Sequence, residues 1–248
     1  MKFEILTIFP EIINDYCSKS ILGKAQTKGV IKVVPHNFRD FTLDKHNRVD
    51  DSPYGGGPGM VLQVEPIYRC LEKIGLVRNG KKSKTLPTGR QVKNLKSKIL
   101  IMDPAGKKFD QQQAEKLAKN YDRLVFVCGR YEGFDERVYK FVDEKVLVGD
   151  YVLAGGELPA LTIIEAVSRL IPGVLGNVES LKEETHNGLR TTDYRRQNEA
   201  KTEDRRLKSN KEYPQYTRPE NFMGLKVPKI LLSGDHKKIE EWRNKKQK

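Results

Sequence analysis

Cysteine is scarce in this chain of 248 residues, and the three present, Cys17, Cys70 and Cys128, show no C-x-x-C spacing. An odd number without that spacing indicates neither a disulfide framework nor a zinc site, and it favours a reducing compartment. No run approaches the roughly 18 apolar residues of a membrane-spanning helix, and the N-terminal MKFEILTIF lacks a basic-then-apolar signal segment. We therefore expect a cytoplasmic protein with no membrane partner.

Acidic residues are the second shortage, because 33 Asp and Glu stand against 46 Lys and Arg, for a net charge of +13. Such an excess favours a polyanionic partner, since neutralising phosphates releases counterions. On charge alone, a basic protein without a nucleic-acid partner stays an alternative. Residues 78–98 carry eight Lys and Arg and no acid, which is typical of a solvated surface insertion.

Strand and helix patterns alternate along residues 1–175. Apolar and β-branched runs predict strands, and apolar residues at helical spacing predict helices between them. Strand–helix–strand order at this spacing indicates an α/β fold with a parallel sheet. The predicted strands are 3–9, 30–34, 97–102 and 124–127, and the predicted helices are 11–28, 64–76, 110–120 and 160–170.

The composition changes after residue 175. Residues 176–212 are rich in charge and poor in residues that could pack, which predicts an enlarged flexible linker. Residues 213–248 predict a small helical C-terminal element, with an ordered segment at 227–232 and a helix at 237–242. We expect one large domain at 1–175, this linker and the small element.

Two apolar runs end in glycine turns that predict a ligand site. Residues 124–127 lead into GRYEG, and residues 146–148 lead into GDY, with GGELP following at 155–159. Polar loops at the carboxyl ends of buried strands are where open α/β sheets bind ligands. Two tight turns without a ligand are the alternative reading of this pattern. The long polar loop 39–60 also suggests function, although its His and Asp spacing matches no common metal cage.

Five blocks carry a resemblance to a known family. They are VDDSPYGGGPGM (49–60), GRYEGFDERV (129–138), VGDYVLAGGELPAL (148–161), SRLIPGVLG (168–176) and YTRPE (216–220). In this order they resemble the bacterial tRNA (guanine-37-N1) methyltransferases, the TrmD family of the SPOUT superfamily. The resemblance implies a SPOUT-type domain with a deep trefoil knot, a homodimer whose sites are each completed by the partner, and a tRNA with guanosine at position 37 as substrate. The family's C-terminal domain is longer, so a truncated helical domain is expected here.

The resemblance also assigns binding residues. It implies S-adenosyl-L-methionine as methyl donor, and it gives Glu132 a possible Mg²⁺. In the loop 39–60, it implies tRNA binding by His46, Arg48, Asp50 and Tyr54. The implied donor-binding residues are Met102, Asp103, Pro104, Gly129, Tyr131, Glu132, Leu147, Val148, Gly149, Asp150, Tyr151, Val152, Leu153, Gly155, Gly156 and Pro159.

Two residues receive catalytic roles from the resemblance. Arg169 is the cation that faces guanine O6, whereas the sequence alone favours a helix C-terminal charge that complements the macrodipole. Glu184 stands where the family has an aspartate general base; Glu183 is the alternative base, and a charged linker pair is the structural alternative. Two other functions stay open: an RNA-binding homologue with weakened catalysis, and a knotted methyltransferase acting on another RNA.

Overall fold

The computed structural model describes residues 1–54, 58–78, 81–82, 96–176, 216, 220–222 and 225–246. The chain divides into two compact units, Met1–Gly176 and Asn177–Lys248, which are each described by themselves below. The proposed bases Glu183 and Glu184, and the predicted linker beyond residue 176, lie outside the described residues.

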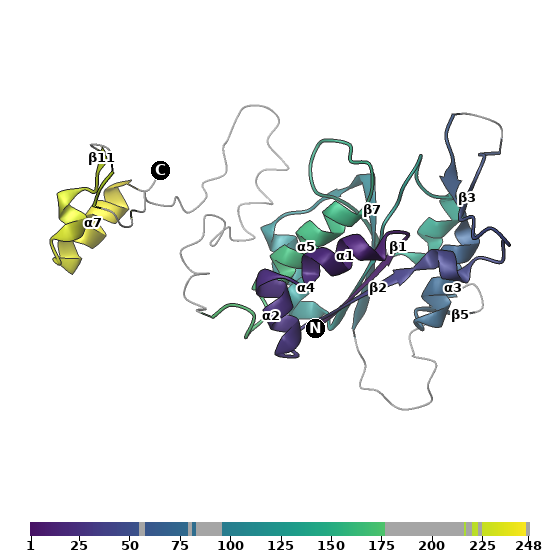
Figure 1. The fold of residues 1–248 in the computed structure, drawn as a ribbon, viewed down its shortest axis with the longest axis horizontal. Helices are drawn as coiled ribbons and strands as arrows, with labels where there is room; N and C mark the ends of the chain where they lie inside the picture. Colours follow the sequence, from purple (N-terminus) through teal and green to yellow (C-terminus); the bar gives the residue numbers. More distant parts are fainter. Residues whose placement is uncertain are drawn as a thin grey trace, which may run out of the picture. The chain divides into compact units, whose positions relative to one another are not determined.

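A five-stranded sheet forms the centre of the first unit, as Figure 1 shows. Every strand pair in it is parallel, in the order β2-β1-β8-β7-β9, which confirms the predicted α/β class with a parallel sheet. Parallel strands need crossover connections, and the helices supply them. The strands are β1 (Lys2–Thr7), β2 (Lys32–Asn37), β7 (Ser97–Lys108), β8 (Arg123–Val127) and β9 (Glu144–Leu147).

Side chains of the sheet alternate between two hydrophobic cores. In β8, Leu124 and Phe126 pack into one core, and Val125 and Val127 pack into the other. All five residues of β8 are buried, as expected for a strand covered on both faces. The unbroken apolar run therefore marks the middle of the sheet.

Helices cover both faces of the sheet (Figure 1). One core takes apolar residues from four helices, and the other takes them from one helix and two short 3-10 turns. The first group is α1 (Pro10–Cys17), α2 (Ser20–Thr27), α4 (Gln111–Asn120) and α5 (Glu157–Arg169), and the second is α3 (Val64–Lys73), η1 (Phe38–Phe41) and η2 (Glu136–Phe141). Two small antiparallel sheets complete the described part of this unit. In one, β3 (Asp50–Asp51) pairs with β4 (Val61–Leu62), and in the other, β5 (Val77–Arg78) pairs with β6 (Lys81–Lys82).

Several element boundaries differ from the sequence prediction. The single helix predicted at 11–28 is wrong: α1 and α2 are separate, because Lys19 is extended and Ser20 has a φ of 52°. Strand β2 extends through Pro35, which an edge strand tolerates because one side needs no partner. Helix α5 begins at Glu157 rather than residue 160. Asp110 caps α4 as expected, and its Oδ1 accepts from the Gln113 amide at 2.8 Å.

A buried ion network joins strands at the amino end of the sheet. Glu4 is 1% exposed and accepts hydrogen bonds from Lys2 at 2.9 Å and from Arg123. Its Oε1 also lies 3.0 Å from His36 Nε2. Arg123 in turn donates to the Ile74 carbonyl at 2.9 Å, just after α3. The network supplies the partners that a buried carboxylate needs.

The described part of the second unit contains one α-helix and three shorter elements. The strands β10 (Asn221–Phe222) and β11 (Leu225–Lys226) pair in antiparallel fashion, and the 3-10 turn η4 (Lys229–Leu232) precedes helix α7 (His236–Lys246). The rings of Tyr216 and Trp242 lie 6.4 Å apart. Across the described residues of both units, no helix is both long and apolar enough to cross a membrane.

Candidate functional site

A cavity of about 290 Å³ opens at the ends of β8 and β9, beside residues 102–104 of β7. Its volume lies near the lower end of ligand cavities, which span roughly 300–1,000 Å³. It includes every residue that the family motifs assign to the methyl donor except Asp150, whose exposed carboxylate instead contacts Lys108 Nζ at 2.5 Å. The structure thus brings residues from three separate segments to one place. Their role in donor binding stays a prediction.

The first wall is an excursion within β7. Both Met102 and Lys107 pair with Val146 of β9, so residues 103–106 leave the sheet and the register then resumes. Asp103 Oδ1 accepts from the Ala105 amide at 2.7 Å, which closes this excursion as a tight turn. Because it lies at the sheet edge formed with β9, the excursion reaches over the strand ends and faces the cavity.

The second wall is the turn after β8. Tyr131 has a φ of 58°, and the Gly133 amide donates to the Arg130 carbonyl at 3.2 Å. Backbone bonds tie this turn to β4: the Glu132 amide donates to Met60 O at 3.0 Å, and the Leu62 amide to Gly133 O at 2.9 Å. The β3–β4 pair, next to the predicted RNA-binding loop, is therefore a direct neighbour of the predicted donor-binding turn.

The third wall is the loop that leads into α5. The Gly156 amide donates to the Gly129 carbonyl at 2.9 Å, so this loop lies directly against the end of β8. A Cβ at Gly156 would lie 2.7 Å from Cys128 Cα and 2.9 Å from the Gly129 nitrogen. Only glycine permits so close an approach of two backbones.

Carboxylates give the cavity its electrostatic character. Asp103 and Glu132 both line it. Asp103 Oδ2 accepts from the Tyr139 hydroxyl at 2.5 Å, and Lys145 Nζ lies 4.0 Å from the same oxygen and 3.5 Å from the Tyr139 ring centroid. Burial, together with the bond to Asp103, raises the pKa of Tyr139, so this phenol stays a proton donor to Asp103.

The residues predicted to bind tRNA lie on a loop organised by Asp44. Its Oδ2 accepts from the backbone amides of His46 at 2.9 Å and Arg48 at 3.1 Å, and its Oδ1 pairs with Arg48 Nη2 at 2.8 Å. The hydrogen bonds from Arg48 hold the pKa of Asp44 well below its usual range. His46, Arg48 and Tyr54 are exposed, and Asp50 lies in β3. Their contact with RNA stays a prediction.

Of the two predicted catalytic residues, the structure describes only Arg169, and Arg169 does not line this cavity. Arg169 is the last residue of α5, whereas the cavity touches Gly156 and Pro159 at the start of that helix. Twelve residues of helix separate Glu157 from Arg169, which is about 18 Å at 1.5 Å per residue. Glu184 lies outside the described residues. No group of three or more His, Cys, Asp or Glu side chains among the described residues could hold a metal, so Mg²⁺ at Glu132 stays a prediction.

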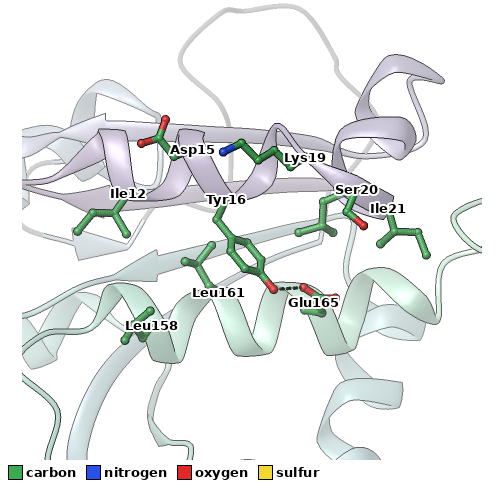
Figure 2. A pocket seen from close by; sticks show the side chains of 10 residues that line it. Ile12, Asp15, Tyr16, Lys19, Ser20, Ile21, Leu158, Leu161 and Glu165 are labelled. Atoms are coloured by element: carbon green, nitrogen blue, oxygen red, sulfur yellow. Dashed lines mark hydrogen bonds between the residues drawn. The ribbon is translucent and has the colours of Figure 1, made fainter.

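A larger hollow of about 550 Å³ lies elsewhere, between α1, α2 and α5. Figure 2 shows Tyr16 reaching from α1 across to α5, where its hydroxyl donates to Glu165 Oε2 at 2.5 Å. The hydrogen bond to Glu165 raises the pKa of Tyr16. Tyr16 is 50% exposed and Leu158 58% exposed. This hollow contains none of the residues predicted to bind the donor, and its walls are helix side chains rather than strand ends.

Sequence reasoning missed a buried charge network beneath the smaller cavity. Arg130 lines the cavity, and its guanidinium pairs with Glu157, which is 1% exposed and also accepts from Thr7. Arg130 lies inside the GRYEG block, but the resemblance gives roles only to its neighbours. Glu157 looks in the sequence like an ordinary acid in a first helical turn, so no sequence signal marks it as buried.

The parallel sheet and the cavity beside its strand ends define an α/β protein with a cavity where folds of this class bind ligands. Comparison with known proteins gives the family. All of residues 1–248 match the family described as tRNA (Guanine-1)-methyltransferase TrmD. The chain belongs to this family of tRNA (guanine-N1) methyltransferases.

Named relatives agree with that family. A protein of Carboxydothermus hydrogenoformans is 46% identical over 246 residues, which is 99% of this chain and 82% of the relative. One of Limosilactobacillus reuteri is 43% identical over 244 residues, 98% of this chain and 83% of the relative. One of Dictyoglomus turgidum is 43% identical over 246 residues, 99% of this chain and 84% of the relative. Each is named tRNA (guanine-N(1)-)-methyltransferase.

Proposed function

We propose that the protein transfers the methyl group of S-adenosylmethionine to N1 of guanosine 37 in tRNA. One observation carries the proposal: segments far apart in the sequence, which the family motifs assign to the donor, line one cavity in a chain of this family. The position of the guanosine and the identity of the donor rest on the resemblance, and the cavity supports them by its chemistry.

The residues present fit such a donor. When bound, S-adenosylmethionine supplies a methyl group activated by a positively charged sulfur. Met102, Val146 and Pro159 give the cavity apolar walls that suit an adenine ring. The carboxylates of Asp103 and Glu132 suit its cationic groups, and the backbone of the loops offers donors and acceptors for the ribose.

The remaining chemistry falls to two side chains, a general base and a cation. Glu184 removes the N1 proton of guanine, since a carboxylate within hydrogen-bond reach can act as general base. Arg169 stabilises the negative charge that then spreads onto O6. Neither side chain forms a bond to the transferred methyl. Both stabilise the deprotonated guanine that accepts it.

The separation along α5 supports a homodimer. The cavity lies at the start of this helix and the proposed catalytic cation at its end, about 18 Å away at 1.5 Å per residue, which favours a cation supplied by a second subunit. We therefore place Arg169 of the partner subunit at the cavity of the first. The apolar hollow between α1, α2 and α5, with Tyr16 and Leu158 exposed, is the surface we propose for the second copy.

Two features of the fold support the family's knot and its RNA contacts. The segment after the edge strand β9 returns across β7 to the end of β8, where Gly156 bonds to Gly129, as a trefoil knot requires. For RNA we propose two separate contact surfaces: the loop with His46, Arg48 and Tyr54 in the first unit, and, in the second unit, helix α7, which ends in Arg243, Lys245 and Lys246.

The first experiment compares two tRNA transcripts that differ only at position 37, guanosine against adenosine, with methyl-labelled S-adenosylmethionine. Incorporation into the guanosine transcript alone is the expected result. No incorporation into either, with the donor still bound, would leave an inactive RNA-binding homologue or a different RNA target. Incorporation into both would refute position 37.

A second experiment tests the shared site by mixing two inactive variants. Arg169→Ala removes the catalytic cation and Gly155→Asp blocks the cavity, so each homodimer should be inactive. Random mixing makes half of the dimers mixed, each with one intact site, so about a quarter of wild-type activity should return. No recovery after mixed dimers are demonstrated would place Arg169 and the cavity in the same subunit's site. Unchanged activity of Arg169→Ala alone would remove Arg169 from the mechanism.

A further inference from the structure

Beneath the cavity lies a buried carboxylate with three donors. Glu157, the first residue of α5, accepts from Thr7 Oγ1 at 2.6 Å and from Arg130 Nε at 3.0 Å. Arg130 Nη2 lies 2.9 Å from the same Glu157 oxygen, Oε2. Burying an unpaired carboxylate is costly, so these donors fix where Glu157 and its partners lie. A carboxylate also suits this position because it stands at a helix N-terminus.

Arg130 connects the two loops that form most of the cavity. Its side chain leaves the turn after β8, pairs with Glu157, and places Nη1 3.5 Å from the Ala154 carbonyl in the loop before α5. The guanidinium carbon lies 4.6 Å from the centroid of the Phe9 ring, which follows β1. The end of β1, the turn after β8 and the loop before α5 therefore meet at one guanidinium.

Gly155 lets that guanidinium reach its partners. A Cβ at this position would lie 2.3 Å from Arg130 Nε and 2.6 Å from Glu157 Oε2. The ion pair thus runs directly over the backbone of a residue that lines the cavity. Arg130 therefore packs directly against the wall of the cavity.

We propose that Arg130 and Glu157 are positioning residues that hold the loops 129–133 and 149–156 in the arrangement that binds the donor. This inference rests on the proposed function, because it assigns the pair to the affinity for S-adenosylmethionine. Loops fixed before binding lose less conformational freedom when the donor arrives, which strengthens binding. The pair takes no part in proton transfer, so the rate of transfer at saturating donor is independent of it. Arginine suits this position because its planar fork directs separate nitrogens at a carboxylate and a carbonyl, whereas the donors of a lysine ammonium all leave one nitrogen.

The central test is Arg130→Lys in the full chain. Lysine keeps a positive charge beside Glu157, so the unfolding temperature should stay near that of the wild type. It cannot bridge Glu157 and Ala154, so the Kd for S-adenosylmethionine, measured by calorimetry, should rise about tenfold. The kcat for tRNA methylation at saturating donor should stay within about threefold, with the loss confined to the KM for the donor.

Arg137→Lys is the matched control. Arg137 makes a two-point pair with Asp135 in the same segment, with Nε at 2.8 Å and Nη2 at 2.7 Å from its oxygens. Its side chain is 63% exposed and does not line the cavity. The same substitution there should leave the Kd for S-adenosylmethionine unchanged. An equal loss of donor affinity in both variants would overturn the proposal.

A second pair of variants separates positioning from stability. Arg130→Met leaves the buried Glu157 with Thr7 as its remaining hydrogen-bond donor, so the unfolding temperature should fall. Adding Glu157→Gln removes the unpaired charge and should restore the unfolding temperature. Donor affinity that stays weak in the stable double variant supports positioning, and affinity that recovers with stability overturns it. A loss in kcat alone would also overturn it. A wild-type protein that fails to bind S-adenosylmethionine would instead refute the proposed function itself.

Discussion

Gly156→Ala tests the close approach of the loop before α5 to the end of β8. Gly156 has a φ of −83° and a ψ of −6°, which alanine adopts without strain, so only the added methyl matters. That methyl would lie 2.7 Å from Cys128 Cα, 2.9 Å from the Gly129 nitrogen and 3.0 Å from Met102 Cβ. Two of these atoms belong to the backbone of a central strand and its turn, which cannot move aside independently.

The magnitude follows from overpacking. Adding a methyl group where the neighbours cannot yield costs about 1–3 kcal/mol. Alanine also reduces the conformational entropy of the unfolded chain, which offsets about 0.4–1 kcal/mol of this cost. The net loss lowers the unfolding temperature by up to roughly 10 °C, at about 2–4 °C per kcal/mol for a unit of this size. The displaced loop also loses the bond from Gly156 to Gly129, so donor affinity should fall at least about tenfold.

The assay is thermal unfolding by calorimetry together with titration of S-adenosylmethionine, and Gly176→Ala is the control. Gly176 lies outside the left-handed region, and a Cβ there meets no atom within 4 Å. Alanine at that position should therefore be neutral or slightly stabilising. Equal unfolding temperatures and donor affinities in Gly156→Ala and the wild type would refute the close-approach argument.

Away from the cavity, Glu4 sets a dependence of stability on pH. Burial raises the pKa of Glu4, but the hydrogen bonds from His36 and Lys2 and the charge of Arg123 outweigh it and lower the value from 4.5 to about 2. The stabilisation, about 3 kcal/mol, is complete above pH 4.5 and is lost as the pH falls from there toward 2. The difference in the free energy of unfolding between Glu4→Gln and the wild type, measured with urea, should therefore narrow over that range. A difference that stays constant would contradict this. Asp110→Ala removes the cap of α4 and should cost about 1 kcal/mol in urea unfolding, whereas a loss under a few tenths would show that the cap bond contributes little. Phe126→Ala empties a fully buried site in β8 and should cost about 3–5 kcal/mol; a cost below about 1 kcal/mol would mean that the core collapses around the gap.

The sequence predicts the sheet well where burial alone decides the structure. The run at 124–127 is apolar on both faces, and it is the middle strand of a sheet covered on both faces. The same patterns predict poorly where a local bond breaks the periodicity. Apolar spacing continues through residues 11–28, so nothing in it reveals that Lys19 leaves the helix and Ser20 takes a positive φ.

In the candidate site too, the sequence predicts local features well and long-range contacts poorly. Glycine turns at strand ends indicate a ligand, and the family motifs give its residues, because both are local in sequence. The pairing of Arg130 with Glu157 joins residues 27 apart, and the contact of Thr7 with Glu157 joins residues 150 apart. Such contacts depend on strand order, which composition and periodicity do not determine. A charged residue at a helix start is exposed in most proteins, so the burial of Glu157 has no sequence signature.

The excursion of residues 103–106 in β7 has a consequence for engineering the enzyme. Met102 and Lys107 both pair with Val146, so the residues between them interrupt the regular pairing of β7 with β9. We expect residues inserted or deleted next to Pro104 and Ala105, both exposed, to reshape one wall of the cavity while the pairing on either side is kept. On the proposed function, this segment is the place to redesign the enzyme for synthetic donors bearing groups larger than methyl.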